Sequence, residues 1–564
     1  MTQHRAGAPI PLVTPWNAFY WRSGADGVLR MQRCARCSKL LFPPGPRCAS
    51  CLGERLDVVE LSGRAVVEAF TVNHQRWHPA FEPPYVIAVV ALAEDPAVRM
   101  TTNIAVAELD DVYIGMPVKV AFERRDDVWI PIFEPDPDAT VREPRIPAPM
   151  VPSRDLEEPA SPVRFVPRLD KFEERVVISG IGMSEVGRRL GRDPLGLMVD
   201  AVLAAIDDAG LTRADIDGIS SYPGGSFDAI SGETGGGIFS LEEVLRIRPL
   251  WFSSGMETSG QTGSVVNAML AVASGLCRHV VCVRGVWAST YQHLQRSGEL
   301  PLAGAHRLAG ELAWRGPYGA FSAANWIGMI ANRHMAVYGT TREQLGAIAL
   351  NARANAMRNP DAVYREPLTM DDYLSARIVS TPFGLYDCDV PCDGAVAVVV
   401  SHVDTVPDLR PPVVRVEAVG TAVTERISWD QGTLLHEPLL EGAARHLWAR
   451  TDLKPSDVDV AELYDGFTFN CLSWIEALGF CEVGEGGRFV EGGARIARDG
   501  ELPLNTNGGQ LSAGRLHGYG FLHEACVQLR GEGGARQVAR PPEVAVVTTG
   551  GGHPGGAWLL TTYR

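Results

Sequence analysis

Apolar positions in residues 174–564 follow two alternating patterns, one typical of buried strands and one typical of helices. The stretch RVVISGIG, at 175–182, is almost continuously apolar and ends in glycine, as a strand buried on both faces does. The stretch PLGLMVDAVLAAIDDAGL, at 194–211, has the spacing of an amphipathic helix, with Gly210 as its stop signal. This alternation predicts an α/β unit.

The same order of elements returns later in the chain. PVVRVEAVG, at 412–420, is again a strand ending in glycine, and PLLEGAARHLWARTDL, at 438–453, is again a helix. The triplets that begin at Asp215 and Asp457 then lead into the next strand in each copy. An internal repeat with a spacing of about 240 residues predicts two similar α/β halves packed together.

The N-terminal part has a different pattern. Short β-rich runs at 63–72, 85–93, 98–106 and 116–125 are separated by turn-like segments, which predicts a small antiparallel barrel. A segment dense in proline and charge follows, without periodic apolar positions, and we interpret it as an extended spacer. The predicted organisation is a ribbon-and-barrel unit at 1–140, a linker at 141–173 and an α/β unit at 174–564.

Four cysteines near the N-terminus have the spacing of a zinc site. Two C-x2-C pairs are separated by ten residues, and they consist of Cys34, Cys37, Cys48 and Cys51. Each pair forms a tight knuckle that directs two thiolates at one point, and four thiolates complete a closed tetrahedral site. Because no position stays open, we expect structural Zn²⁺ rather than a catalytic metal.

Composition narrows the classes of function. The chain has 564 residues, 46% hydrophobic and 21% charged, with a net charge of −15, which argues against a general nucleic-acid binder. We identify no signal peptide and no membrane span, so we expect a cytoplasmic protein with reduced thiols. For the seven cysteines outside the zinc motif, we expect buried structural thiols.

Both units resemble known families. The four cysteines followed by a small barrel resemble the DUF35 family, a rubredoxin-like zinc ribbon plus an OB-fold that accompanies thiolase-like enzymes. Residues 175–564 resemble the thiolase superfamily, in the branch of the lipid-transfer thiolases. The motifs that carry this resemblance are SGQTGSVVNAMLAVASG, AELYDGF, LPLNTNGGQLSAGRLHGYGF and TTGGGHPGGAW. The resemblance implies a duplicated αβαβα fold preceded by a zinc ribbon and an OB-fold.

The departures from the thiolase pattern concern its catalytic groups. The thiolase nucleophile is a cysteine at the start of the Gly-rich helix, and this position aligns with Gly260. The histidine of the family's HD-F motif is Tyr464, and the histidine of its Gly-rich turn aligns with Arg515. The second family cysteine is Thr548 or Thr549. Covalent thiolase chemistry is therefore not expected.

Loss of the thiols with gain of ionisable groups resembles the lipid-transfer-like aldolases of steroid side-chain degradation, which pair with a DUF35 protein. The resemblance implies retro-aldol cleavage of a β-hydroxyacyl-CoA to a ketone and a short acyl-CoA, such as propionyl-CoA or acetyl-CoA, without a redox cofactor. It implies catalytic roles for Tyr464 and Tyr519, one as base and the other as acid. A tyrosine base requires a lowered pKa, and Arg515 and His517 are the local candidates for lowering it.

Four residues besides the two tyrosines belong to the predicted site. His517, His553 or backbone N–H groups of the Gly-rich turns would hold the enolate oxygen. Asp465 is expected to orient a neighbour or to cap a helix rather than to transfer a proton. For Arg515, a structural ion pair is the alternative to a role at the site.

Two other functions remain open at the level of sequence. One is an acyltransferase that uses a hydroxyl nucleophile such as Ser259, and the other is a non-catalytic acyl-CoA or lipid carrier or a scaffold for a hydratase. The resemblance to these families also implies a homodimer through the thiolase-like unit and an enoyl-CoA hydratase docked on the DUF35-like unit.

Overall fold

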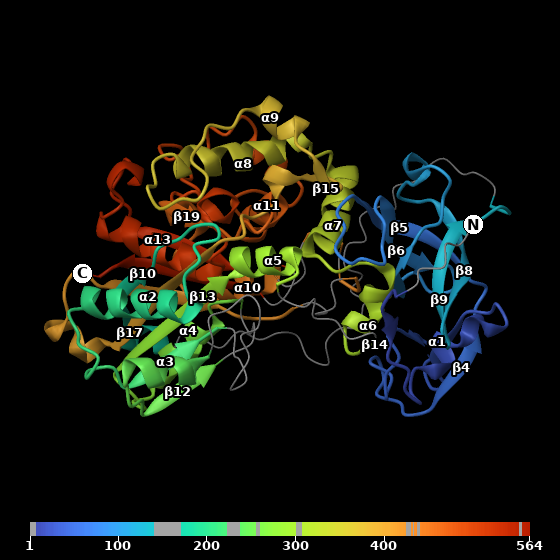
Figure 1. Ribbon diagram of the computed structural model, residues 1–564, viewed down its shortest axis with the longest axis horizontal. Coiled ribbons are helices and arrows are strands. Elements are labelled where there is room, and N and C mark those ends of the chain that lie inside the picture. Colours follow the sequence, from blue (N-terminus) through green and yellow to red (C-terminus); the bar gives the residue numbers. More distant parts are fainter. Residues whose placement is uncertain are drawn as a thin grey trace.

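The nine-stranded sheet of the C-terminal unit is the centre of the computed structural model, which describes residues 7–139, 171–222, 237–254, 260–299, 307–424, 430–432, 434–436, 440–551 and 555–563. Its strand order is β12-β11-β13-β17-β10-β18-β21-β20-β19. The strands are β10 (Val176–Met183), β11 (Gly218–Ser221), β12 (Trp251–Ser254), β13 (His279–Trp287), β17 (Asp393–His402), β18 (Val414–Gly420), β19 (Val460–Glu462), β20 (Val544–Thr549) and β21 (Gly556–Thr562). Helices cover the sheet in Figure 1.

The sheet confirms the predicted duplication. β10 and β18 pair antiparallel at its middle, and outward from this seam the order β10-β17-β13-β11 matches the order β18-β21-β20-β19. Each half begins with strand, helix, strand, where the helix is α2 (Pro194–Asp208) in one half and α10 (Leu440–Ala449) in the other. The predicted stop of the first-half helix is confirmed, since α2 ends just before Gly210, which has a φ of +74°. At its start, the Asp193 side chain caps α2 by accepting from the Gly196 N–H.

Two helices form the buried layer of this unit. They are α4 (Gly263–Ala273) in the first half and α13 (Gly518–Arg530) in the second, and most residues of each are buried. α4 lies against strands of the first half, and α13 lies against β20, β19 and β17. These two helices carry the Gly-rich motifs of the sequence at their N-termini.

The N-terminal unit contains the predicted ribbon and barrel. The ribbon is the three-stranded sheet β3-β2-β4, with β2 at Arg30–Cys34, β3 at Leu40–Leu41 and β4 at Leu56–Glu60. The barrel strands are β5 (Arg64–Asn73), β6 (Tyr85–Leu92), β7 (Arg99–Asn103), β8 (Pro117–Arg125) and β9 (Val128–Pro135). β5 pairs with both β6 and β8, and an Ile104–Phe133 bridge links the end of β7 to β9, so the five strands close.

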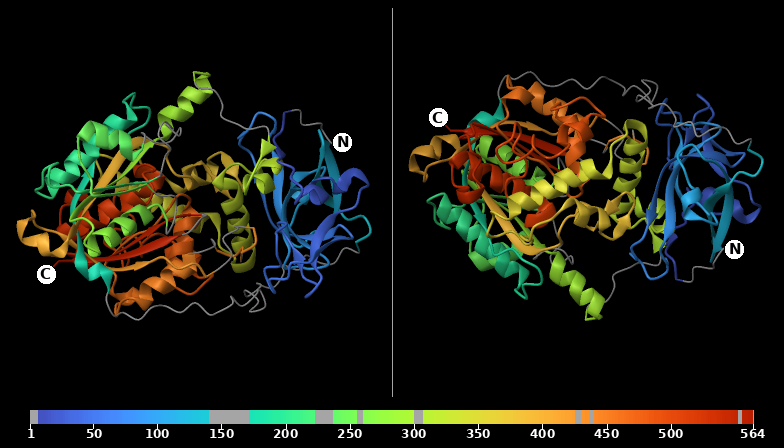
Figure 2. Two further views of the ribbon diagram at one scale, coloured as in Figure 1. Left: turned by 90° about the horizontal axis from the view of Figure 1, so that it is seen from below. Right: turned by 90° about the horizontal axis from the view of Figure 1, so that it is seen from above.

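The barrel contacts the α/β unit directly, in addition to its covalent connection through the linker. β15 (Ile378–Ser380) pairs with β5 through Ser380 and Asn73, and α7 (Ala323–Tyr338) packs on β5. The views from below and above in Figure 2 show helices of the α/β unit against the barrel. One hydrophobic core includes Phe81 and Ile87 of the barrel unit together with residues of α4 and α7. The two units are therefore packed as one body in this structure.

In the described part of the chain, no helix combines the length and the apolar character needed to cross a membrane.

Candidate active site

The N-termini of α4 and α13 meet inside the α/β unit. The hydroxyls of Ser264 and Tyr519, one in the first turn of each helix, share a hydrogen bond of 2.6 Å. The Thr262 hydroxyl accepts from the Trp558 indole N–H at 2.8 Å and lies 3.3 Å from the Thr549 hydroxyl. A helix N-terminus presents unpaired N–H groups and partial positive charge, so two of them favour an anionic group at this point.

Gly260 lies against Thr549 at this junction. Its φ is +73°, and a Cβ built on it would lie 2.0 Å from the Thr549 hydroxyl oxygen and 2.9 Å from the Thr549 carbonyl oxygen. The two positions that align with the thiolase cysteines therefore face each other, which supports that alignment. A cysteine at 260 would require the backbone to move, so this position does not hold a side-chain nucleophile.

Tyr464 lies beside two glycines that leave room for its ring. A Cβ on Gly466 or on Gly551 would lie 2.8 Å from the ring of Tyr464. The Tyr464 backbone N–H donates to the Thr548 hydroxyl at 2.9 Å, and its ring meets that of Phe521 edge-on, with centroids 6.3 Å apart. The loop between β19 and α11 (Thr468–Ala477) thus places Tyr464 next to β20 and α13.

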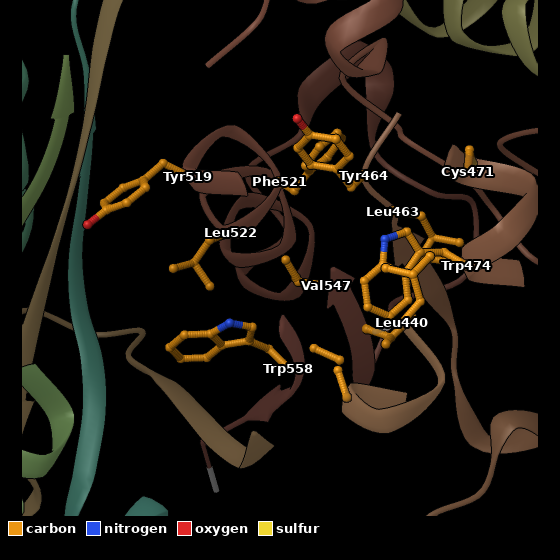
Figure 3. Packing of buried hydrophobic residues seen from close by; sticks show 14 of the residues in the cluster. Leu440, Leu463, Tyr464, Cys471, Trp474, Tyr519, Phe521, Leu522, Val547 and Trp558 are labelled. Carbon is orange, nitrogen blue, oxygen red and sulfur yellow. The ribbon is translucent and has the colours of Figure 1, made fainter. Parts of the chain in front are cut away.

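Tyr519 lies on a different side of α13. Figure 3 shows Tyr464 and Phe521 together on one side of this helix, with the ring of Tyr519 on the other and its hydroxyl directed away from Tyr464. Tyr519 is completely buried, and burial raises its pKa well above the usual value, although its hydrogen bond with Ser264 opposes the shift. The lowered pKa that a tyrosine base requires is therefore not found at Tyr519, which stays a protonated phenol.

His517 has a defined tautomer. Its Nδ1 lies 2.8 Å from a guanidinium nitrogen of Arg284, and because a guanidinium is only a donor, Nδ1 accepts. Burial and the charges of Arg284 and Arg515 lower the pKa of His517 well below its usual value. The imidazole is therefore neutral and carries its proton on Nε2, which makes it a hydrogen-bond donor of fixed orientation.

His517 also has an unusual backbone and lines a small cavity. Its φ of +54° lies in the region that non-glycine residues rarely adopt, and such strain persists where the surroundings fix it. The cavity, about 30 Å³, lies between the Gly-rich turn and α13. Its lining includes Gln510, Leu516, His517 and Phe521.

Arg515, His553 and Ser259 are the predicted residues that remain to be located. Arg515 lies 3.8 Å from the Asp389 carboxylate and its backbone N–H donates to the Val390 carbonyl, so the structure shows the ion pair that was the structural alternative for this residue. His553 lies outside the described residues, as does Ser259. Sequence reasoning missed Arg284, although an arginine inside the apolar strand HVVCVRGVW was a usable signal.

Asp465 holds the Gly-rich turn in place. Its carboxylate accepts from the Gln510 N–H at 2.8 Å and from the Asn505 side chain at 2.9 Å. A Cβ on Gly509 would lie 1.9 Å from this carboxylate, so only glycine fits where the turn becomes the π-helical segment Gly509–Ala513. Burial raises the pKa of Asp465 to about 7. The contacts support an orienting role.

We expect Asp465 to make stability depend on pH. The usual aspartate pKa is 3.8 and burial raises it to about 7, so between these values the folded protein holds a proton that the unfolded chain releases. The contribution of this group to the free energy of unfolding should fall as pH rises through this window, by roughly 1.4 kcal/mol per pH unit at most, and level off above it. In Asp465→Asn this contribution should vanish. Urea unfolding of both proteins from pH 4.5 to 8 measures it, and parallel curves would refute it.

The four N-terminal cysteines form the expected cluster. Their sulfurs lie within 4.8 Å of one another, with Cys34–Cys51 and Cys37–Cys48 distances of 3.5 Å. Four thiolates around one zinc ion lie about 3.8 Å apart, so this geometry fits structural zinc. The other seven cysteines are free thiols, and burial raises the pKa of each of them: Cys277, Cys282, Cys388, Cys392, Cys471, Cys481 and Cys526. None is prepared as a nucleophile.

Three family models match the chain. Residues 21–57 match the ChsH2 rubredoxin-like zinc ribbon domain, residues 58–123 match the ChsH2 C-terminal OB-fold domain, and residues 420–557 match the thiolase C-terminal domain-like family. These matches confirm the two family resemblances drawn from the sequence.

Characterised relatives include both lyases and transferases. The chain is 34% identical to a steroid side-chain-cleaving aldolase of Thermomonospora curvata over 69% of this chain and 98% of the relative. It is 33% identical to the 17-hydroxy-3-oxo-4-pregnene-20-carboxyl-CoA lyase of Mycobacterium tuberculosis, over 68% of this chain and 99% of the relative. An acetyl-CoA acetyltransferase of Methanothermobacter thermautotrophicus is 30% identical over 64% of this chain and 93% of its own length. The contact of Gly260 with Thr549 favours the lyases.

One similar solved structure is that of an aldolase with a DUF35 component. The Ltp2-ChsH2(DUF35) aldolase superposes with a TM-score of 0.60 at 31% identity, over 69% of this chain and 98% of the matched one. A monomeric SCP2-thiolase-like protein of Mycobacterium smegmatis superposes with a TM-score of 0.51 at 16% identity over 70% of this chain and 78% of that chain, a likeness of fold. In the present protein, ribbon, barrel and thiolase-like unit lie in one polypeptide.

Proposed function

Because this chain belongs to the steroid side-chain-cleaving aldolases of the thiolase superfamily, which are carbon–carbon lyases, we propose that it cleaves the side chain of a bulky β-hydroxyacyl-CoA, such as a steroid thioester, by a retro-aldol reaction. The observation that carries this proposal is Gly260 against Thr549, which leaves no side-chain nucleophile where a thiolase has its cysteine. A retro-aldol reaction needs none.

The reaction requires three actions. A base takes the proton of the tertiary β-hydroxyl, and the Cα–Cβ bond breaks as the C–O bond becomes a ketone. The electron pair of the broken bond moves onto the thioester carbonyl as an enolate, and an acid then protonates the enolate carbon. The products are a ketone and a shorter acyl-CoA, such as propionyl-CoA, without an acyl-enzyme or a redox cofactor. The protein must supply a base, an acid and donors for the enolate oxygen.

We assign the binding of the enolate oxygen to the point where the N-termini of α4 and α13 meet. His517 offers its Nε2–H in a fixed, neutral tautomer, because Arg284 occupies Nδ1. The N-termini of α4 and α13 add their backbone N–H groups and dipoles at the same place. Donors that are fixed before the charge develops stabilise it without reorganisation.

Proton transfer is assigned to the two tyrosines. Tyr464 takes the hydroxyl proton, since it holds the position of the family histidine and the small neighbours Gly466 and Gly551 leave room for its ring beside β20 and α13. Tyr519 acts as the acid that protonates the enolate carbon, since its raised pKa keeps the phenol protonated and a hydrogen bond with Ser264 holds its hydroxyl in place. Asp465 and Arg515 keep the Gly-rich turn in place, and His553 stays a proposed donor of the adjoining turn.

The direct test is product analysis. Purified full-length protein is incubated with a steroid acyl-CoA that carries a tertiary β-hydroxyl, and ketone and short acyl-CoA are quantified. Equal amounts of both are expected. Binding of the thioester without any ketone would instead identify a carrier or scaffold, and a trapped acyl-enzyme would identify an acyltransferase.

We also propose that the protein forms a homodimer through β12. This strand is at the edge of the sheet, and Leu250 and Phe252 are 77% and 55% exposed, beside the exposed Phe239 and Val244 of α3 (Ile238–Leu245). The edge strand is short, but exposed apolar side chains gathered beside a sheet edge are the kind of surface that proteins cover with a partner. Phe252→Asp should give a monomer in light scattering at a concentration where wild type is a dimer. Val58→Asp, on the ribbon surface, is the control, and an unchanged mass for Phe252→Asp would contradict the proposal.

Three further proposals complete the functional assignment. Zn²⁺ bound by the four cysteines is structural. A cytoplasmic location is proposed from the sequence, because cysteines at metal-ligand spacing together with scattered single cysteines are typical of a reducing compartment. Hydration of an enoyl-CoA produces a tertiary β-alcohol, so an enoyl-CoA hydratase that docks on the DUF35-like unit would supply the substrate. Co-purification of a hydratase with the full-length chain tests this partner.

A further inference from the structure

A second cavity lies next to the predicted site, and its lining is rich in arginine. Its volume is about 440 Å³. Four arginines and two tyrosines give it its chemical character: Arg188, Arg296, Arg353, Arg377, Tyr364 and Tyr386. An apolar ligand such as a steroid ring would leave these guanidinium groups desolvated and without an anion, so the lining selects against it.

The four arginines have no carboxylate partner among the described residues. Among the described residues that line the cavity, Asp389 is the acid, and its carboxylate lies 3.8 Å from Arg515. Within the described part of the chain, Arg296 forms no salt bridge, and Arg377 donates to the neutral side chain of Gln75 at 3.1 Å. In a protein with a net charge of −15, four such cations around one cavity indicate an anionic ligand.

Arg353 is held in a fixed position for such a ligand. It is buried, donates to the Ser512 hydroxyl at 3.0 Å and to the Glu366 carbonyl at 2.9 Å, and lies over the rings of Tyr364 and Tyr386. Burial lowers its pKa, although the nearby tyrosines and the charge of Glu366 oppose the shift. A fixed, planar guanidinium suits bidentate recognition of phosphate.

The cavity shares its wall with the predicted active site. The Asp389 N–H donates to the Gly466 carbonyl, two residues after Tyr464, and the Val390 N–H donates to the Gln510 carbonyl. Leu511 lines this cavity, whereas its neighbour Gln510 lines the small cavity that contains His517. A ligand with its phosphates at the arginines and a reactive end near Tyr464 and His517 would follow this wall.

We propose that this arginine cavity binds the phosphate groups of the CoA nucleotide. The proposal rests on the proposed function, because it takes the acyl-CoA as substrate. A CoA thioester carries a diphosphate and a 3′-phosphate far from its reactive carbonyl, so a cationic cavity next to the active site matches its distribution of charge. Arg296 and Arg377 are exposed and Arg353 is buried, so the cavity offers the phosphates guanidinium groups both at the surface and inside.

The test measures binding and cleavage separately. Calorimetry with CoA, 3′-dephospho-CoA and inorganic phosphate compares wild type with the double variant Arg296→Ala/Arg377→Ala. Loss of one guanidinium–phosphate contact weakens binding by about tenfold or more, so the double variant should bind CoA about 100-fold more weakly. The matched control, Arg445→Ala/Arg488→Ala, removes two exposed arginines elsewhere and should bind CoA as wild type does. Cleavage of a steroid pantetheine thioester, which has no nucleotide, should be unchanged in the double variant.

Each alternative result has one meaning. CoA binding by the double variant at the wild-type affinity overturns the cavity assignment, and so does wild type that binds inorganic phosphate as tightly as CoA. If no variant cleaves any thioester, the proposed function fails, whereas the calorimetry still decides whether the cavity binds CoA.

Discussion

Replacing Tyr464 by phenylalanine should lower kcat for side-chain cleavage by roughly 10²–10⁴-fold, the usual contribution of one proton-transfer group. KM should stay within about threefold of wild type, because the ring and its contacts with Phe521 and the nearby glycines remain. Steady-state kinetics with the steroid thioester measures both parameters. Wild-type kcat in Tyr464→Phe would remove Tyr464 from the mechanism.

The role of Tyr519 can be separated by a pair of variants. Tyr519→Phe and Ser264→Ala each remove the 2.6 Å hydrogen bond between α13 and α4, but only the first removes the phenol. If the phenol donates the proton, Tyr519→Phe should lose at least about tenfold more kcat than Ser264→Ala. Equal losses in the two variants would show that Tyr519 only positions α4, and wild-type rates in both would exclude either role.

Replacing Glu68 by alanine should destabilise the protein by about 3–5 kcal/mol, the usual effect of breaking a buried ion pair. Glu68, on β5, accepts two hydrogen bonds from Arg99 of β7, at 2.6 and 3.0 Å, and lies 3.4 Å from Arg333 of α7. All three side chains are almost completely buried. Removal of the carboxylate leaves two buried guanidinium groups of two units without their anion, and neither can lose its proton.

The measurement is denaturant unfolding followed by both fluorescence and circular dichroism, since a protein with two units need not unfold in one step. Glu60→Ala is the matched control, because Glu60 lies on the ribbon and its ion pair with Arg30 is exposed. Its effect should be below about 1 kcal/mol. A small effect in Glu68→Ala as well would mean that the barrel is attached to the α/β unit more loosely than the structure shows.

The sequence predicted those features of the fold that a local pattern of residues specifies. The zinc ribbon followed from four cysteines at fixed spacing, and the duplicated sheet followed from strands that end in Gly182 and Gly420. The prediction that Gly260 replaces the thiolase cysteine also came from a local Gly-rich motif, and the contact of Gly260 with Thr549 supports it.

The features that sequence did not predict depend on contacts between distant residues. Arg284 sets the tautomer of His517 across 233 positions, and Ser264 meets Tyr519 across 255. No local pattern specifies such a pair, because each residue alone fits an ordinary buried strand or helix. The same holds for the joint between the units, where β15 extends the barrel sheet through Ser380 and Asn73.

The central claim is carbon–carbon cleavage through an enolate without a covalent acyl-enzyme, and one incubation tests it most directly. The full-length protein is mixed with the β-hydroxyacyl-CoA in D₂O without free CoA, and mass spectrometry follows products and protein together. The claim predicts ketone and short acyl-CoA in equal amounts, one deuterium on the α-carbon of the acyl-CoA, and a protein that carries no added acyl mass after back-exchange into H₂O. Products that form only after free CoA is added, or a protein mass raised by an acyl group, would contradict it.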